Sequence, residues 1–172
     1  MLSERQQQMV ALFEKHVAAE FEGDLDTTMA TMSNDPHVHN VPTMVGGNGQ
    51  SGVQAFYRDH LIGQFFPPDV KMENVSRTVG EDQIVDELVI SFTHTMVIDW
   101  MLPGVAPTGK PVEIAFTVIV GVQDDKITHE HIYWDQASVL VQIGLIDPAG
   151  LPVTGAEGAR RVLNPKLSPR DF

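Results

Sequence analysis

The spacing of apolar residues changes near residue 70, from a helical period to the alternation that is typical of strands. Before that point Val10, Phe13, Val17 and Phe21 recur at steps of three or four residues, with charged residues and glutamines between them. This pattern predicts an amphipathic helix over residues 3–22. The glycine that follows is expected to end it.

Two shorter helices are predicted before the pattern changes. Asp24 is placed to cap a helix that runs to Met32, and a short strand follows over residues 37–41. A third helix is expected to begin at a capping box in residues 51–54 and to end before Pro67.

After residue 70, four segments with a period of two predict four strands. They cover residues 70–79, 83–100, 111–123 and 126–136. The short links between most of them favour antiparallel neighbours. A straight strand over residues 83–100 would span about 59 Å at about 3.3 Å per residue, so this segment must bend or break. A strongly curved sheet is therefore expected.

This order of elements predicts an α+β fold in which the three N-terminal helices cover the concave face of a cone-shaped antiparallel sheet. A length of 172 residues fits a single core. We expect that domain over residues 1–146, followed by an extended C-terminal tail over residues 147–172 that contains several prolines.

The composition of the chain limits the classes of molecule that the protein could bind and the kinds of site that it could contain. The chain has a net charge of −12, which disfavours binding to nucleic acid or acidic membranes and favours a small neutral ligand. It contains no cysteine, which excludes disulfides and thiolate metal sites. No apolar run approaches the roughly 20 residues of a membrane helix. The first residues lack the order of a signal peptide, so we expect a cytoplasmic protein.

Several short motifs occur in the second half of the chain. They are PTGKPVE over residues 107–113, Asp125-Lys126-Ile127, Asp135 and Gln142-Ile143-Gly144. With the order of elements, they resemble the SnoaL-like branch of the nuclear-transport-factor and ketosteroid-isomerase superfamily over roughly residues 5–146. The chain departs from the usual pattern at Asp125, His131 and Ile143, where relatives often carry Gly, Trp and Leu.

The resemblance implies a cystatin-like α+β barrel and a ligand cavity. It also implies a cofactor-independent enzyme that performs acid/base proton transfer on a hydrophobic carbonyl compound, as a polyketide cyclase, isomerase or dehydratase does. The alternative is a non-catalytic domain that binds a small ligand or stabilises a partner, or a domain associated with dienelactone-hydrolase-type metabolism. A fold of this kind hosts both classes.

Several side chains that could take part in catalysis lie on the last predicted strand. His129, His131, Tyr133 and Asp135 share one face of it, because successive strand side chains alternate. Glu130, Ile132 and Trp134 share the other face. A hairpin that is symmetric about residues 124–125 would place the row that contains His131 in an apolar cavity or interface. The resemblance implies that Asp135 is the acid/base residue, since SnoaL-type cyclases carry a proposed catalytic Asp at the matching strand end. The competing interpretation is that Asp135 caps a following helix.

The remaining candidates complete the expected site. His131 and Tyr133 would orient the substrate or stabilise an oxyanion, and His94 is a further catalytic candidate. The expected ligand-binding residues are Trp134, Phe116, Phe56, Met101, His39 and His129.

No metal or other cofactor is expected, because the sequence lacks a complete ligand motif. A metal-assisted hydrolase would require at least three of five histidines to converge. These are His37, His39, His94, His129 and His131. We also expect a homodimer, because the helices cannot cover the convex face of the sheet and its alternate row is apolar. That row includes Ile119, Thr117, Ile132 and Trp134. The basic residues of the tail would then pair with acidic groups.

Overall fold

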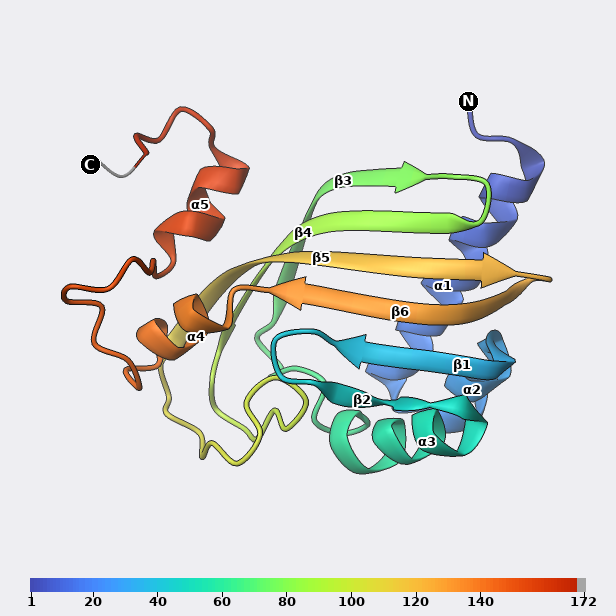
Figure 1. Cartoon of the computed structure of the whole chain (residues 1–172), viewed down its shortest axis with the longest axis horizontal. Helices are drawn as coiled ribbons and strands as arrows, with labels where there is room; N and C mark the ends of the chain where they lie inside the picture. Colours follow the sequence, from blue (N-terminus) through green and yellow to red (C-terminus); the bar gives the residue numbers. More distant parts are fainter. Residues whose placement is uncertain (170–172) are drawn as a thin grey trace.

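The computed structural model describes residues 1–169. One curved, open sheet forms its centre, and helices lie against the sheet and at one end of it (Figure 1). The elements are α1 (Glu4–Glu22), α2 (Leu25–Thr31), β1 (Met32–Asn40), β2 (Val45–Asn48), α3 (Gly49–Phe56), the π-helical turn η1 (Tyr57–Leu61), β3 (Lys71–Val79), β4 (Gln83–Thr93), β5 (Pro111–Gln123), β6 (Lys126–Trp134), α4 (Gln136–Gln142) and α5 (Glu157–Leu163). The predicted α+β cone is confirmed.

The sheet has the order β2-β1-β6-β5-β4-β3. All neighbours are antiparallel except β1 and β6, which run parallel. The N-terminal hairpin therefore extends the sheet. The strand predicted over residues 37–41 corresponds to the second half of β1, whereas β2 was not predicted. The cavity side of the sheet, called the inner face below, is crossed by α1, while α3 and η1 close its β1 end.

Local signals fix the first helix as predicted. The Ser3 hydroxyl accepts a hydrogen bond from the Gln6 backbone N–H, and the Ser3 backbone N–H donates to the Gln6 side-chain oxygen, which completes a capping box. Gly23 ends α1 in the left-handed conformation, with φ of 75°. The side chain of Asp24 then caps α2, as the sequence indicated. The side chains of α1 that face the sheet are thereby held in one orientation.

The long strand predicted over residues 83–100 breaks, as its length required. β4 ends at Thr93, and residues 94–110 form a loop that returns to β5. Trp100, Met101 and Leu102 in this loop are buried in the core. The indole N–H of Trp100 donates to the Phe65 carbonyl at 2.9 Å, which anchors the loop to the segment after η1. The loop thus closes one end of the inner face.

A β-bulge in the last hairpin changes the register that symmetry would predict. Near the turn Val122 lies opposite Ile127, but beyond it Gly121 lies opposite His129, so one extra residue has entered β6. Tyr133 consequently pairs with Thr117 instead of Phe116. Because a shift of one residue exchanges the faces of a strand, Glu130, Ile132 and Trp134 point to the inner face. The prediction that Ile132 and Trp134 belong to the convex row is therefore wrong.

The sequence suggested an extended tail after α4. The structure instead shows that this segment contains the helix α5. This helix packs on the outer face of the same chain's sheet, where Ala159 is buried. Arg160 forms a bidentate pair with Glu113 of β5, at 2.9 and 2.5 Å. The tail therefore pairs one of its basic residues with an acidic residue of the same chain. Arg170 lies outside the described residues, and a homodimer remains a prediction.

Within residues 1–169, no helix combines the length and the apolar character that crossing a membrane requires.

The close approach of β2 to α3 yields a stability prediction. A Cβ added at Gly47 would meet the Gly52 carbonyl oxygen at 2.3 Å, whereas one added at Gly52 finds no atom nearer than 3.8 Å. We expect Gly47→Ala to lower the free energy of unfolding by about 1–3 kcal/mol through overpacking. Gly52→Ala, inside α3, should raise it by up to about 1 kcal/mol through helix propensity. Urea unfolding measures both, and shifts of the same sign would contradict this account.

Candidate functional site

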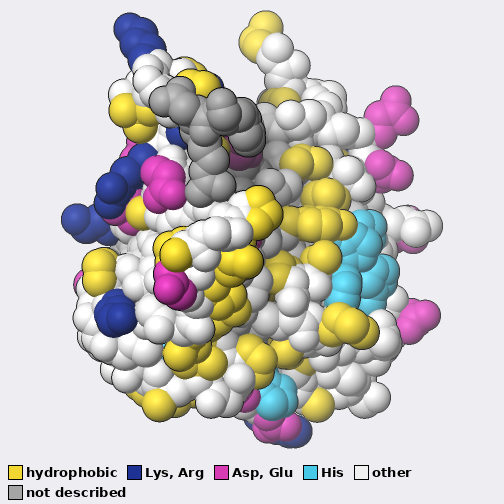
Figure 2. All heavy atoms as spheres, turned by 60° about the vertical axis from the view of Figure 1, so that its left-hand side comes forward, with side chains coloured by type: hydrophobic (Ala, Val, Ile, Leu, Met, Phe, Trp, Pro, Cys, Tyr) yellow, Lys and Arg dark blue, Asp and Glu magenta, His cyan; other side chains and the backbone are white. Residues whose placement is uncertain are grey.

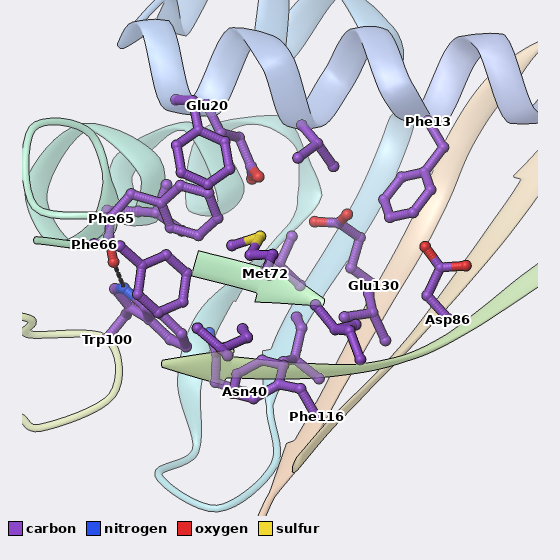
Figure 3. Close-up of a pocket in the computed structure, with 18 of the residues that line it drawn as sticks. Phe13, Glu20, Asn40, Phe65, Phe66, Met72, Asp86, Trp100, Phe116 and Glu130 are labelled. Atoms are coloured by element: carbon purple, nitrogen blue, oxygen red, sulfur yellow. Dashed lines mark hydrogen bonds between the residues drawn. The ribbon is translucent and has the colours of Figure 1, made fainter. Parts of the chain in front are cut away.

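A cavity of about 440 Å³ lies between α1 and the inner face of the sheet. Its walls are mainly aromatic and aliphatic, and the aromatic rings of Phe65, Phe66 and Trp100 gather at one end (Figure 3). Other apolar residues that line it include Phe13, Phe56, Met72, Leu88 and Phe116. This volume and lining are typical of a pocket for a small hydrophobic molecule.

Four ionisable side chains meet at the wall of this cavity. His16 and Glu20 come from α1, Tyr57 from η1 and Glu130 from β6, and all four are buried. Figure 3 shows the carboxylates of Glu20 and Glu130 entering the cavity from the helix and from the sheet. We call these four residues the inner cluster. π-Helical turns such as η1 occur frequently at functional sites.

Short contacts join the inner cluster through Glu130. The Tyr57 hydroxyl donates to Oε2 of Glu130 at 2.8 Å. Nε2 of His16 lies 3.0 Å from the same hydroxyl, 3.4 Å from Oε1 of Glu20 and 3.5 Å from Oε2 of Glu130. One imidazole therefore faces two carboxylates, and a phenol holds one of them.

The hydrogen-bond geometry around His16 favours a proton on each ring nitrogen. The Thr31 hydroxyl donates to the Thr28 carbonyl at 2.6 Å, so its oxygen accepts from Nδ1 of His16, also at 2.6 Å. The Tyr57 hydroxyl donates to Glu130 and so accepts from Nε2. An imidazole that donates from both nitrogens is a cation. The inner cluster is thus built around a buried ion pair.

Electrostatic interactions and burial shift the pKa values of the two carboxyl groups in opposite directions. Burial alone would lower the pKa of His16, but Glu130 and Glu20 raise it to about 10. Burial alone would raise the pKa of Glu130, yet the His16 cation and the hydrogen bonds from His16 and Tyr57 hold it below its ordinary value. Burial dominates at Glu20 and raises its pKa. The arrangement therefore makes Glu20 the weaker acid of the two and favours the ionised form at Glu130.

The ligand atoms of His16, Glu20 and Glu130 also lie within 4.8 Å of one another, which is compatible with a metal ion. The contacts of His16 argue against that use, because both of its nitrogens are already engaged by the hydroxyls of Thr31 and Tyr57. The inner cluster is better described as an ion pair with a second, weaker acid beside it.

A second polar group lies farther along the cavity. Arg77 of β3 makes a bidentate pair with Asp86 of β4, with both contacts at 2.7 Å, and also contacts Glu14 of α1 at 3.0 Å. Its guanidinium lies 5.7 Å from the centre of the Phe13 ring. These groups give one region of an otherwise apolar cavity a charged rim.

The polar row predicted from the last strand lies on the other side of the sheet. The expectation that Asp135, His131 and Tyr133 open into one cavity is therefore incorrect, because the bulge turns their row outward. Tyr133 is 41% exposed. Asp135 accepts a hydrogen bond from the Ser138 backbone at 3.2 Å and caps α4, which is the competing interpretation of that residue.

The expected ligand-binding residues are divided between the two faces. Phe116 and Phe56 line the cavity as expected. Trp134 is stacked on Phe116 with ring centres 5.2 Å apart, and Met101 is fully buried, so both support the wall from behind. His39 and His129 lie on the outer face, because each is one residue away from an inward-facing neighbour.

His94 is buried in the loop after β4 and does not line the cavity. Its Nδ1 lies 3.1 Å from the Thr108 hydroxyl, while its Nε2 has no hydrogen-bond partner in the described part of the chain. Burial lowers the pKa of His94, so the ring is neutral. The structure does not bring it to the other candidates.

Sequence reasoning missed His16, Glu20 and Tyr57. A signal was present in α1, because its buried residues Met9, Phe13, His16 and Glu20 follow steps of four, three and four. Polar residues that continue an apolar stripe on one face of a helix must be buried with it. Glu130 was recognised as facing away from His131, but the direction of that face was not known.

Comparison with known proteins identifies the family. The sequence profile described as SnoaL-like polyketide cyclase matches residues 8–143, which is most of the chain. The chain belongs to this family. No match was found among curated proteins. Proteins of the SnoaL-like family have a fold that is used by small-molecule cyclases and isomerases, and the cone and cavity described above agree with it.

Solved structures share the fold at low sequence identity. A protein from Jannaschia sp. CCS1, described as a SnoaL-like polyketide cyclase, is 16% identical with a TM-score of 0.68, covering 86% of this chain and 99% of that one. IdmH from Streptomyces antibioticus, described as a polyketide cyclase, is 22% identical with a TM-score of 0.60, covering 80% and 99%. SalBIII, an epoxide hydrolase/cyclase-like enzyme of pyran ring formation in salinomycin, is 14% identical with a TM-score of 0.54, covering 74% and 91%.

The buried ion pair predicts an unusual titration of His16. Because its pKa is raised from 6.5 to about 10 on folding, its stabilisation is complete below pH 6.5 and is lost as the pH rises through about 10. We expect the NMR signal of the His16 ring, assigned through His16→Gln, to keep its imidazolium position through neutral pH. Glu130→Gln should lower the midpoint, since it removes the counter-charge. A wild-type midpoint below 6.5 would contradict the ion pair.

Proposed function

We propose that this protein is a cofactor-independent enzyme that transfers protons on a hydrophobic carbonyl compound, as in a cyclisation, isomerisation or dehydration. The observation that supports this proposal is the position of Glu130 and Glu20 together on the wall of an apolar cavity. Two carboxyl groups whose environments favour opposite protonation states are the usual arrangement of a base and an acid.

In the proposed reaction, the Glu130 carboxylate removes a proton from the carbon next to the substrate carbonyl. The electron pair moves to the carbonyl oxygen, and the Glu20 carboxyl group donates its proton to that oxygen to give the enol. In an isomerisation, Glu130 returns the proton to another carbon of a conjugated enol, and the enol O–H gives its proton back to Glu20 as the carbonyl re-forms. In a cyclisation, the enol carbon attacks a second carbonyl, whose oxygen takes the proton held by Glu130, while the enol O–H returns its proton to Glu20. These steps need only the two carboxyl groups, in keeping with the cyclases among the structural neighbours.

His16 and Tyr57 act as positioning residues in this proposal. The His16 cation keeps Glu130 ionised in an apolar setting, and the Tyr57 hydroxyl fixes one of its oxygens at 2.8 Å. The second oxygen of Glu130 remains available to a substrate. The aromatic end of the cavity would bind the body of the molecule, and a ring system of modest size fits a volume of about 440 Å³.

Solvent exchange on a simple ketone tests the proposed base. In deuterated buffer, the protein should accelerate the exchange of the α-protons of 2-tetralone, a bicyclic apolar ketone, as followed by NMR. Glu130→Gln should reduce the accelerated rate by about 100-fold or more, because it removes the general base. Glu20→Gln should reduce it as well. Circular dichroism and ligand-detected NMR of 2-tetralone confirm that each variant folds and still binds.

Asp135→Asn is the matched comparison for this experiment. Asparagine caps helices about as well as aspartate, so both stability and exchange should stay close to those of the wild type. If Asp135 were the acid/base residue, as the resemblance implied, its variant would lose the exchange and Glu130→Gln would keep it. Binding of the ketone without any exchange would instead support the alternative of a non-catalytic binding domain.

A further inference from the structure

Four partly buried histidines form a patch on the outer face of the sheet. His37 and His39 lie on β1, and His129 and His131 lie beside them on β6, since the parallel register pairs 37 with 129 and 39 with 131. Figure 2 shows histidine side chains gathered in one such patch on the surface. These imidazoles face away from the cavity and take no part in the proposed reaction.

Three of these rings have the mutual spacing of metal ligands. Their ring centres lie 5.2 Å apart for His37 and His129, 5.0 Å for His37 and His131, and 4.8 Å for His129 and His131. With Zn–N bonds of about 2.0 Å and tetrahedral angles, the centres of two bound imidazoles lie about 5 Å apart. All three spacings agree with this value, so rotation of the rings is the main change that binding needs.

One pair of nitrogens is already close to the required distance. Nε2 of His37 and Nε2 of His131 are 2.8 Å apart, and two imidazole nitrogens on one tetrahedral zinc ion are separated by about 3.3 Å. The hydrogen that the two nitrogens now share would be displaced by the ion, so each would supply a lone pair.

The neighbouring strand leaves room for the third ring. A Cβ at Gly121 of β5 would lie 2.1 Å from Cε1 and 2.4 Å from Nδ1 of His129. Only glycine at this position lets the ring lie where it does, next to the other two. The bulge described above places His129 opposite Gly121. A net charge of −12 further favours a cation at the surface.

We propose that His37, His129 and His131 form a binding site for a borderline divalent transition-metal ion such as Zn²⁺. Imidazole nitrogen is a ligand that zinc, copper and nickel favour, whereas magnesium and calcium prefer oxygen. His39, whose ring centre is 6.3 Å from that of His131, lies at the edge of the site. The bound ion would link β1 to β6, the one parallel pairing of the described sheet.

Titration of the untagged, metal-stripped chain with Zn²⁺ tests this site. We expect one ion per chain by calorimetry, no comparable binding of Mg²⁺, and a rise in the melting temperature with zinc. Bound Co²⁺ should show the intense visible absorption of tetrahedral coordination. Separate substitutions His37→Asn, His129→Asn and His131→Asn should each weaken zinc binding by at least about tenfold, because each removes one of three protein ligands.

Two control variants make the result specific. His60→Asn, an exposed histidine on η1 that pairs with Asp99, should bind zinc as the wild type does. His16→Gln should also keep the site, because His16 belongs to the inner cluster. Loss of binding in His16→Gln with retention in His37→Asn would place the ion in the cavity and overturn the proposal. Wild-type affinity in all three outer-face variants would overturn it too.

Discussion

The buried contact between His16 and Glu130 is the interaction on which the site depends. It joins α1 to β6 across the cavity, and Tyr57 adds η1 to the same point. Removing two charges from water costs several kcal/mol per ion, and apolar residues of similar volume often give equal or better stability. The ion pair is therefore poor evidence for stability. Its presence on a cavity wall is better explained by chemistry that needs an ionised carboxylate in an apolar setting.

Once that pair is formed, the raised pKa of Glu20 follows from its surroundings. A single cation shared by two buried carboxyl groups can balance one negative charge, and the hydrogen bond from Tyr57 favours Glu130 for it. Glu20 then has no second counter-charge, and burial raises its pKa above the ordinary value. The cluster thus offers the proposed base and acid because it holds one histidine for two glutamates. An additional basic residue beside Glu20 would remove the distinction between them.

Much of the fold could be predicted from the sequence, whereas the location of the site could not. The apolar steps of α1, the caps at Ser3 and Asp24 and the period of two after residue 70 are local signals. The face of β6 depends on one extra residue between the turn and His129, and nothing in the local pattern marks it. Because the period of a strand is two, that extra residue places Glu130 in the cavity and turns His131 to the outer face. The inner cluster also needs contacts between residues 16, 57 and 130, which only the folded chain supplies.

The same bulge places the two proposed sites on opposite faces of one strand. It points Glu130, Ile132 and Trp134 to the cavity and leaves His129 and His131 outside, beside the histidines of β1. The two sets share a backbone, so a constraint placed on the outer histidines also acts on the position of Glu130. A metal ion that linked β1 to β6 would fix the strand that carries the proposed base, without touching a substrate. Coupling between the two faces would then be mechanical, through strand pairing, and would require no residue to reach both sites.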